Sequence, residues 1–271
     1  VGNGTDALEI AIEALNLPKR SEVILPVNTW ISTAEAVTRN GLKVVFCDIS
    51  LNDYSIDLDD LKKKISINTS AIIPVHLFGL CADIDSIKEV LPKSIFIVDD
   101  AACAVGSTYK EKPAGSLGDF GCFSFHPRKT ITTGEGGMIT TNDDKLATKA
   151  NILRNHGASL SEEIRHKSTK PYVLPEFNVL GFNYRMTDLQ GAIGLAQLQK
   201  LQDFLSQRTK WAGWYNKNLS DISWIKLPKV PKHSKHSWQA YVTVIDESSS
   251  PVSRNKLMEF LLDEGISSRP G

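Results

Sequence analysis

The chain has 271 residues, of which 41% are hydrophobic and 23% charged, so it can bury a full core, and its length suggests about two domains. Its 31 basic residues balance 31 acidic residues, so no overall charge attracts nucleic acid or an anionic membrane surface. No stretch approaches the roughly 20 consecutive apolar residues of a membrane-spanning helix. We therefore expect a globular protein that binds neither nucleic acid nor membrane.

Apolar residues in the first half of the chain alternate between helical and strand-like patterns. From Leu8 they recur at i, i+3, i+4 and i+7, which predicts a helix. Asp6 and Glu9 are expected to form a capping box at its start, and Pro18 is expected to end it. Buried strands are expected at 22–25, 43–47, 71–75, 94–98, 120–125 and 137–141, and helices at 31–39, 58–65 and 84–90. This alternation predicts βαβ units, and hence an α/β fold with a mostly parallel sheet flanked by helices.

The second half has a different pattern. Helices are expected at 145–154 and 254–264, a long helical pattern at 186–219, a strand at 238–245, and a polar, irregular functional loop at 156–180. We expect a large domain over residues 1–210 and a small C-terminal α/β domain over residues 211–271. One strand and one helix would leave that small domain incomplete. The chain also begins at Val1 rather than methionine, which favours a fragment or a processed chain.

The four cysteines are widely spaced and form no CxxC pair: Cys47, Cys81, Cys103 and Cys122. Three of them lie in or beside apolar, strand-like stretches. This predicts buried free thiols rather than a disulfide framework or a zinc site. We therefore expect no metal centre and a cytoplasmic protein.

The segment SFHPRKTITTGEGG over residues 124–137 places Lys129 five residues after Ser124 and shortly before a glycine cluster. An isolated lysine in such a turn is usually a solvated side chain. Here the pattern suits a lysine that reaches a phosphate-bearing aldehyde, because Ser124 and nearby backbone amides could hold the phosphate. With an acidic residue upstream, this is the arrangement of a pyridoxal phosphate (PLP) site, in which the lysine forms a Schiff base.

Asp100 is the acidic partner that this site requires. It ends an apolar strand and precedes two alanines, which leave room for a flat ring. A carboxylate at the carboxyl end of a strand lies where α/β sheets bind ligands. Its charge would keep the ring nitrogen of PLP protonated. Asp99 should point to the other face of the sheet, so we assign it no cofactor role.

Three further candidates are individually weaker. Gly4 and Thr5 precede the first helix, whose first-turn amides favour an anion, although such a pair most often only caps a helix. Trp30 could stack on a cofactor ring, although a lone tryptophan more often packs in a core. Asn183 could contact phosphate, although alone it is more often a turn residue.

These residues belong to an ordered series of motifs: Gly4-Thr5, Thr29-Trp30, PVHLFG at 74–79, DDAA at 99–102, FSFHPRK at 123–129, GEGG at 134–137, RNHG at 154–157 and NYRM at 183–186. Together, over nearly the whole chain, they resemble the DegT/DnrJ/StrS family of PLP-dependent sugar aminotransferases. The resemblance implies a fold-type I aminotransferase that forms a homodimer with active sites at the subunit interface. It also implies amino transfer from L-glutamate to a nucleotide-linked keto sugar, for the biosynthesis of a surface polysaccharide or glycoside.

The resemblance gives most of the candidate residues a role: Lys129 matches the Schiff-base lysine, Asp100 the partner of the ring nitrogen, Thr5 and Ser124 the phosphate ligands, Trp30 the stacking aromatic, and Asn183 a residue that reaches the phosphate of the neighbouring subunit. Gly4 precedes Thr5 in the same motif. Cys103 is a departure, because many members carry glutamine or histidine there, in contact with the ring hydroxyl. The resemblance therefore leaves the role of Cys103 open.

Three other functions remain alternatives. Sugar 3-dehydratases of the same family replace the Schiff-base lysine with histidine, so Lys129 argues against that reaction. A non-catalytic regulatory or binding relative would have lost cofactor residues, and only Cys103 points that way. An aminotransferase acting on a non-sugar cyclic ketone is the third, because substrate selection lies in loops that the motifs do not define.

Overall fold

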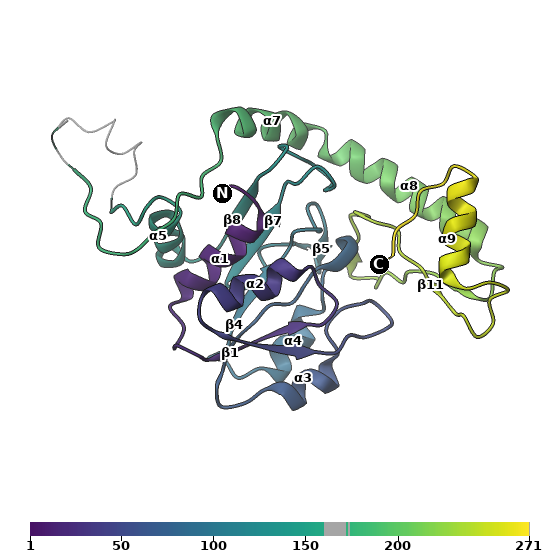
Figure 1. Ribbon diagram of the computed structural model, residues 1–271, viewed down its shortest axis with the longest axis horizontal. Coiled ribbons are helices and arrows are strands. Elements are labelled where there is room, and N and C mark those ends of the chain that lie inside the picture. Colours follow the sequence, from purple (N-terminus) through teal and green to yellow (C-terminus); the bar gives the residue numbers. More distant parts are fainter. Residues whose placement is uncertain (160–171, 173, 271) are drawn as a thin grey trace.

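The computed structural model describes residues 1–159, 172 and 174–270. Its centre is a six-stranded sheet in the order β2-β1-β3-β4-β7-β8 (Figure 1). Five strands are parallel and β8 runs antiparallel to β7. The strands are β1 (Glu22–Pro26), β2 (Lys43–Cys47), β3 (Thr69–Ile72), β4 (Phe96–Asp100), β7 (Phe120–Ser124) and β8 (Gly137–Thr140).

Helices cover both faces of this sheet and bury a separate apolar core on each. One core joins the sheet to α1 (Gly4–Leu15), α2 (Ile31–Arg39) and α5 (Asp144–Leu153). The other joins it to α3 (Leu58–Lys64) and α4 (Ile84–Val90). Strand alternation divides the side chains between the two cores, with Val23 and Leu25 on the first face and Ile24 on the second. This is the expected α/β arrangement of a mostly parallel sheet flanked by helices.

The elements of the first half match the expected ranges closely, with three local corrections. The strand expected at 94–98 spans Phe96–Asp100. The strand expected at 71–75 spans Thr69–Ile72 instead. The expected capping box at Asp6 is wrong, because Asn3 caps α1 and its side chain accepts a hydrogen bond from the Asp6 N–H at 2.9 Å. The four cysteines are free thiols, and three of them are buried.

The second half differs more from the expected elements. The pattern at 186–219 forms two helices, α7 (Asp188–Gln199) and α8 (Leu201–Leu219), which meet at Lys200. The strand expected at 238–245 is reduced to β11 (Val244–Ile245), which pairs with β9 (Ile225–Lys226). The helix α9 (Arg254–Asp263) forms nearly as predicted. Most of the loop expected at 156–180 lies outside the described residues.

The proposed domain boundary at residue 210 falls inside α8, and it remains a prediction. Figure 1 shows α8 leading away from the sheet toward β11 and α9. None of the helices in the described part of the chain combines the length and the apolar character needed to cross a bilayer.

Residues 234–240 join a second, three-stranded sheet and pair with the loop after β3. The strand β10 (Ser234–Lys235) pairs with β5 (Thr108–Tyr109), which also pairs with β6 (Lys112–Pro113). Ser237 N–H then donates to the Gly79 carbonyl at 2.9 Å, and Ala240 N–H to the Phe78 carbonyl at 3.2 Å. This backbone pairing fastens the C-terminal part of the chain to the loop after β3.

The contact between these segments requires glycine at position 79. Gly79 has φ +105°, and an added Cβ would overlap the Ser237 hydroxyl and lie 3.0 Å from the Gln239 nitrogen. A side chain at this position would therefore meet both backbone strain and a steric obstacle.

We predict that Gly79→Ala destabilises the protein more than Gly41→Ala. Gly41 also has a positive φ, +68°, but nothing lies within 4 Å of its added Cβ, so this control isolates the close approach. Gly41→Ala should lower the free energy of unfolding by about 1 kcal/mol, and Gly79→Ala by about 2–5 kcal/mol because overpacking adds to the strain. Denaturant unfolding of both variants measures the difference. Equal losses would show that the segments are not held this closely.

Candidate active site

The lysine segment and Asp100 meet at the edge of the sheet formed by the carboxyl ends of its parallel strands, because β4 and β7 are parallel neighbours. Asp100 pairs in register with Cys122, so β4 ends two residues before β7 ends at Ser124. The chain then turns, and the Lys129 N–H donates to the His126 carbonyl at 2.9 Å. This turn brings Lys129 Nζ to 3.2 Å from Cys103 Sγ, on the loop that follows β4.

Asp100 is deeply buried, with 5% of its surface exposed. Its Oδ2 accepts a hydrogen bond from Thr33 Oγ1 at 2.9 Å, and its Oδ1 accepts one from the Ala102 N–H at 3.2 Å. Burial raises the pKa of the Asp100 carboxyl, while these two hydrogen bonds and the positive charge of Lys129 act in the opposite direction. Among the described residues Asp100 has no ion-pair partner. A cationic group placed beside it would stabilise its charge.

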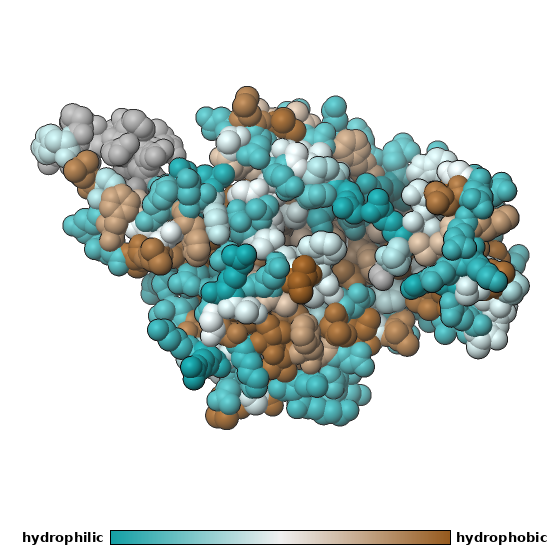
Figure 2. Space-filling view, viewed as in Figure 1, coloured by the Kyte–Doolittle hydropathy of each residue, from teal (hydrophilic) through white to brown (hydrophobic). Residues whose placement is uncertain are grey.

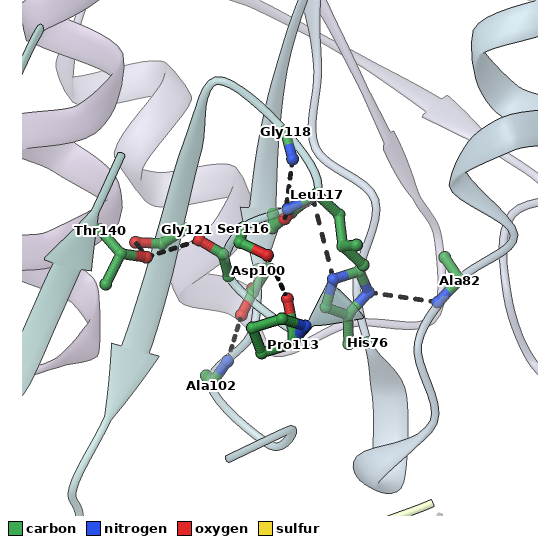
Figure 3. A network of polar contacts seen from close by, with 12 residues as sticks. His76, Ala82, Asp100, Ala102, Pro113, Ser116, Leu117, Gly118, Gly121 and Thr140 are labelled. Atoms are coloured by element: carbon green, nitrogen blue, oxygen red, sulfur yellow. Dashed lines mark hydrogen bonds and ion pairs between the residues drawn. The ribbon is translucent and has the colours of Figure 1, made fainter. Parts of the chain in front are cut away.

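Asp99 lies on the opposite face of β4, as strand alternation predicts. Its Oδ2 accepts hydrogen bonds from the backbone N–H groups of Leu117 and Gly118 at 2.9 and 3.0 Å. Its Oδ1 faces Nε2 of the fully buried His76 at 3.8 Å. Figure 3 shows His76 between Ala82 and the Leu117–Gly118 turn, with Asp100 directed toward Ala102. Adjacent carboxylates therefore belong to two separate networks.

The first turn of α1 lies directly beside Ser124. An added Cβ on Gly4 would lie 2.8 Å from Ser124 Cβ and 3.3 Å from Ser124 Oγ. The preceding segment is held in place because the Gly137 N–H donates to the Val1 carbonyl at 3.0 Å. Helix-start amides next to a serine hydroxyl form an anion-binding arrangement. The structure thus brings together Gly4, Thr5 and Ser124, the phosphate candidates from the sequence.

The other two candidates are placed differently. Trp30 is 77% exposed at the start of α2, one helical turn before Thr33, so its ring is not part of the core. Asn183 is exposed too, in a segment that bridges to Asn155. In the described part of the chain its side chain makes no hydrogen bond to Ser124 or Lys129.

The sequence reasoning missed two contacts of the site. Thr33 was not singled out, although it lies one turn after Trp30 on the helix face that packs against the sheet. Its hydroxyl also lies 2.8 Å from that of Thr29, which extends the hydrogen-bond chain from Asp100. The contact between Cys103 and Lys129 has no sequence signal, because 26 residues separate the two positions.

These groups fit PLP on their own chemistry. An amine that reaches the site could bond to the aldehyde, and the buried Asp100 carboxylate lacks the cation that a protonated ring nitrogen provides. The anion-binding arrangement at Ser124 suits the phosphate. The residues that would hold the cofactor are thus Lys129, Asp100, Ser124 and the first turn of α1.

Comparisons with known proteins agree with this chemistry. The sequence model of the DegT/DnrJ/EryC1/StrS aminotransferase family matches residues 1–270. The GDP-perosamine synthase of Caulobacter vibrioides is 40% identical in an alignment that covers 99% of this chain and 70% of that protein.

Two solved structures have the same fold. The aminotransferase from Psychrobacter cryohalolentis superposes with a TM-score of 0.91 at 29% identity, covering 98% of this chain and 70% of that one. The E. coli GDP-4-keto-6-deoxy-D-mannose-3-dehydratase with bound hydrated PLP gives 0.89 at 29% identity, covering 100% and 72%. The chain therefore belongs to the DegT/DnrJ/EryC1/StrS family and is a PLP-dependent aminotransferase with the fold-type I architecture.

Proposed function

We propose that this aminotransferase moves an amino group from L-glutamate to a keto sugar carried on a nucleotide, in the biosynthesis of an amino sugar for a surface polysaccharide or glycoside. The similarity to a GDP-perosamine synthase supports an amino-sugar product linked to GDP. The similarity to a GDP-4-keto-6-deoxy-D-mannose dehydratase supports a GDP-linked 4-keto-6-deoxy sugar as the first acceptor to test.

One observation carries the proposal: the Lys129 amine and the buried Asp100 carboxylate lie at the same sheet edge, beside the anion-binding turn of α1. An amine at position 129 favours amino transfer over the dehydratase reaction, because a lysine can both bond to the cofactor and, once released, move a proton. The presence of Lys129, Asp100 and the anion-binding turn also argues against the alternative of a non-catalytic binding protein, because the residues that the chemistry needs are present.

Each residue of the site has a defined task in this reaction. When bound, PLP supplies an electron-withdrawing ring that stabilises negative charge on the substrate carbon. Asp100 holds the proton on the ring nitrogen, and Thr33 and the Ala102 N–H fix the direction of its carboxylate. The free Lys129 amine accepts the proton from the Cα of the amino donor and later returns one to the acceptor carbon. Ser124 and the first turn of α1 hold the phosphate.

We predict that the full-length enzyme with L-glutamate aminates a GDP-linked 4-keto-6-deoxy sugar, whereas Lys129→Ala does not. Mass spectrometry of the amino-sugar product and assay of the 2-oxoglutarate formed would measure both half-reactions. Borohydride reduction should fix the cofactor to the wild type and not to Lys129→Ala. The panel should include other nucleotide keto sugars and a non-sugar cyclic ketone. Turnover of the cyclic ketone alone would refute the sugar proposal.

We predict that Asp100→Asn reduces kcat/KM far more than Asp99→Asn. Losing one hydrogen bond to a charged group in a buried site costs about 1.5–3 kcal/mol, which corresponds to about 10- to 150-fold in rate. An asparagine at position 99 can still accept the two backbone hydrogen bonds from Leu117 and Gly118. Steady-state kinetics with matched cofactor loading separate the variants. Similar losses at both positions would mean that the two faces of β4 are assigned incorrectly.

We further propose that the enzyme acts as a homodimer in which Asn183 completes the phosphate site of the partner. In support, α7 has no buried residue, and its large apolar side chains are exposed, Leu189 to 80% and Leu195 to 67%. Figure 2 shows hydrophobic surface where α7 lies in Figure 1. A helix that exposes large apolar side chains on more than one side marks an interaction surface. Asn183 lies five residues before α7, and among the described residues its side chain makes no hydrogen bond to Ser124 or Lys129.

We predict that mixing Lys129→Ala with Asn183→Ala restores activity that neither variant has alone. In the mixed dimer one site carries both mutations and the other carries neither, so one site should work. Activity should approach a quarter of the wild-type value at equal mixing, because about half of the dimers are mixed and each has one intact site. Sedimentation and mass spectrometry verify that mixed dimers form. Proven mixing without recovered activity would place Asn183 outside the partner's site.

A further inference from the structure

The loop after β4 places the Cys103 thiol at the same sheet edge as Asp100. The Ala102 N–H donates to Asp100 Oδ1 at 3.2 Å, and the Ala104 N–H donates to the Ala101 carbonyl at 2.9 Å, so the chain turns immediately after the strand. The Ser237 hydroxyl lies 3.5 Å from the Cys103 carbonyl. The position of the thiol is therefore set by backbone contacts on both sides.

Lys129 Nζ donates a hydrogen bond to Cys103 Sγ at 3.2 Å. In the described part of the chain, this amine makes no other hydrogen bond and no ion pair. An unbonded lysine side chain samples many rotamers. Because this amine has a single fixed partner, that hydrogen bond sets where the amine lies. The partner here is a thiol, whereas the nearby carboxylate of Asp100 is bonded to Thr33 and Ala102.

The structure assigns Cys103 a positioning role: its sulfur accepts a hydrogen bond from the free amine of Lys129 and keeps that amine directed into the site. This inference rests on the proposed function, in which Lys129 moves the substrate proton. A carboxylate in this place would favour the charged ammonium, which cannot accept a proton. A neutral thiol can hold the amine with much less preference for its charged form.

The charges around Cys103 make the contact measurable. Burial raises the pKa of the Cys103 thiol, Asp100 acts in the same direction, and the positive charge and hydrogen bond of Lys129 lower it. His76 acts electrostatically on Asp100, the carboxylate that in turn affects Cys103. Burial also raises the pKa of Cys47 and Cys81 to about 12, and it raises that of Cys122. All four thiols therefore titrate at raised pH, so the contribution of Cys103 has to be obtained from a variant that lacks it.

The first test uses thiolate absorbance of the cofactor-free, full-length enzyme as a function of pH. The difference between wild type and Cys103→Ala gives the titration of Cys103. Lys129→Met should move that titration to higher pH, because it removes the positive charge that favours the thiolate. Cys47→Ala is the matched control and should leave the curve unchanged. An unmoved titration in Lys129→Met would overturn the contact.

The second test uses the cofactor-loaded enzyme. Cys103→Ala should lower kcat by about 3- to 10-fold, the effect of one lost hydrogen bond, with little change in the KM for glutamate. Cys103→Ser retains an acceptor and should recover most of the loss. Melting temperatures of both variants would identify a loss caused by misfolding. Equal kcat values in wild type and Cys103→Ala would overturn the positioning role.

Borohydride reduction separates failure of this inference from failure of the proposed function. If Cys103→Ala fixes the cofactor at Lys129 and turns over at the wild-type rate, only the role of Cys103 is wrong. If the wild type itself fixes no cofactor at Lys129, the proposed role of Lys129 is wrong, and the role of Cys103 is overturned with it.

Discussion

The site depends on the parallel pairing of β4 with β7. Because the two strands run in the same direction and end within two residues of each other in register, their carboxyl ends deliver Asp100 and the Ser124–Lys129 turn to one edge. An antiparallel pair would have placed these groups at opposite ends of the sheet. The loop after β4 and the first turn of α1 then reach the same edge, so the amine, the carboxylate and the anion-binding amides converge without long loops.

The buried carboxylate at this edge is expensive to maintain, since burial disfavours its charge. The chain offsets part of that cost with Thr33 and the Ala102 N–H, and a cationic cofactor ring would offset more. Because side chains alternate along β4, Asp99 lies on the opposite face of the strand from Asp100. There it accepts hydrogen bonds from the Leu117 and Gly118 N–H groups and lies close to His76. Asp100 can thus bind the cofactor while Asp99 stabilises the turn at Leu117 and Gly118, because the two side chains lie on opposite faces of the sheet.

Segments outside the large sheet also pack near the carboxyl ends of β3 and β4. Gly79 lets residues 234–240 approach the loop after β3 closely, and Ser237 from that segment touches the loop that carries Cys103. Beyond the sheet, α7 leaves its apolar side chains exposed. Exposed apolar side chains of this kind mark an interaction surface, which supports the proposed association of subunits.

Local sequence determined the alternation of strands and helices, the identity of the lysine segment and the opposite orientation of Asp99 and Asp100, because each of these follows from periodicity or spacing over a few residues. Tertiary structure decided the rest. The helical pattern at 186–219 contains no proline, yet it breaks at Lys200, where α7 ends and α8 begins. Residues 238–243 have a strand's composition, but the Ala240 N–H donates to the Phe78 carbonyl instead of to a neighbouring strand. Thr33 reaches Asp100 and Cys103 reaches Lys129 only because elements distant in sequence pack together, and side-chain contacts of that kind leave no periodic signal in the chain.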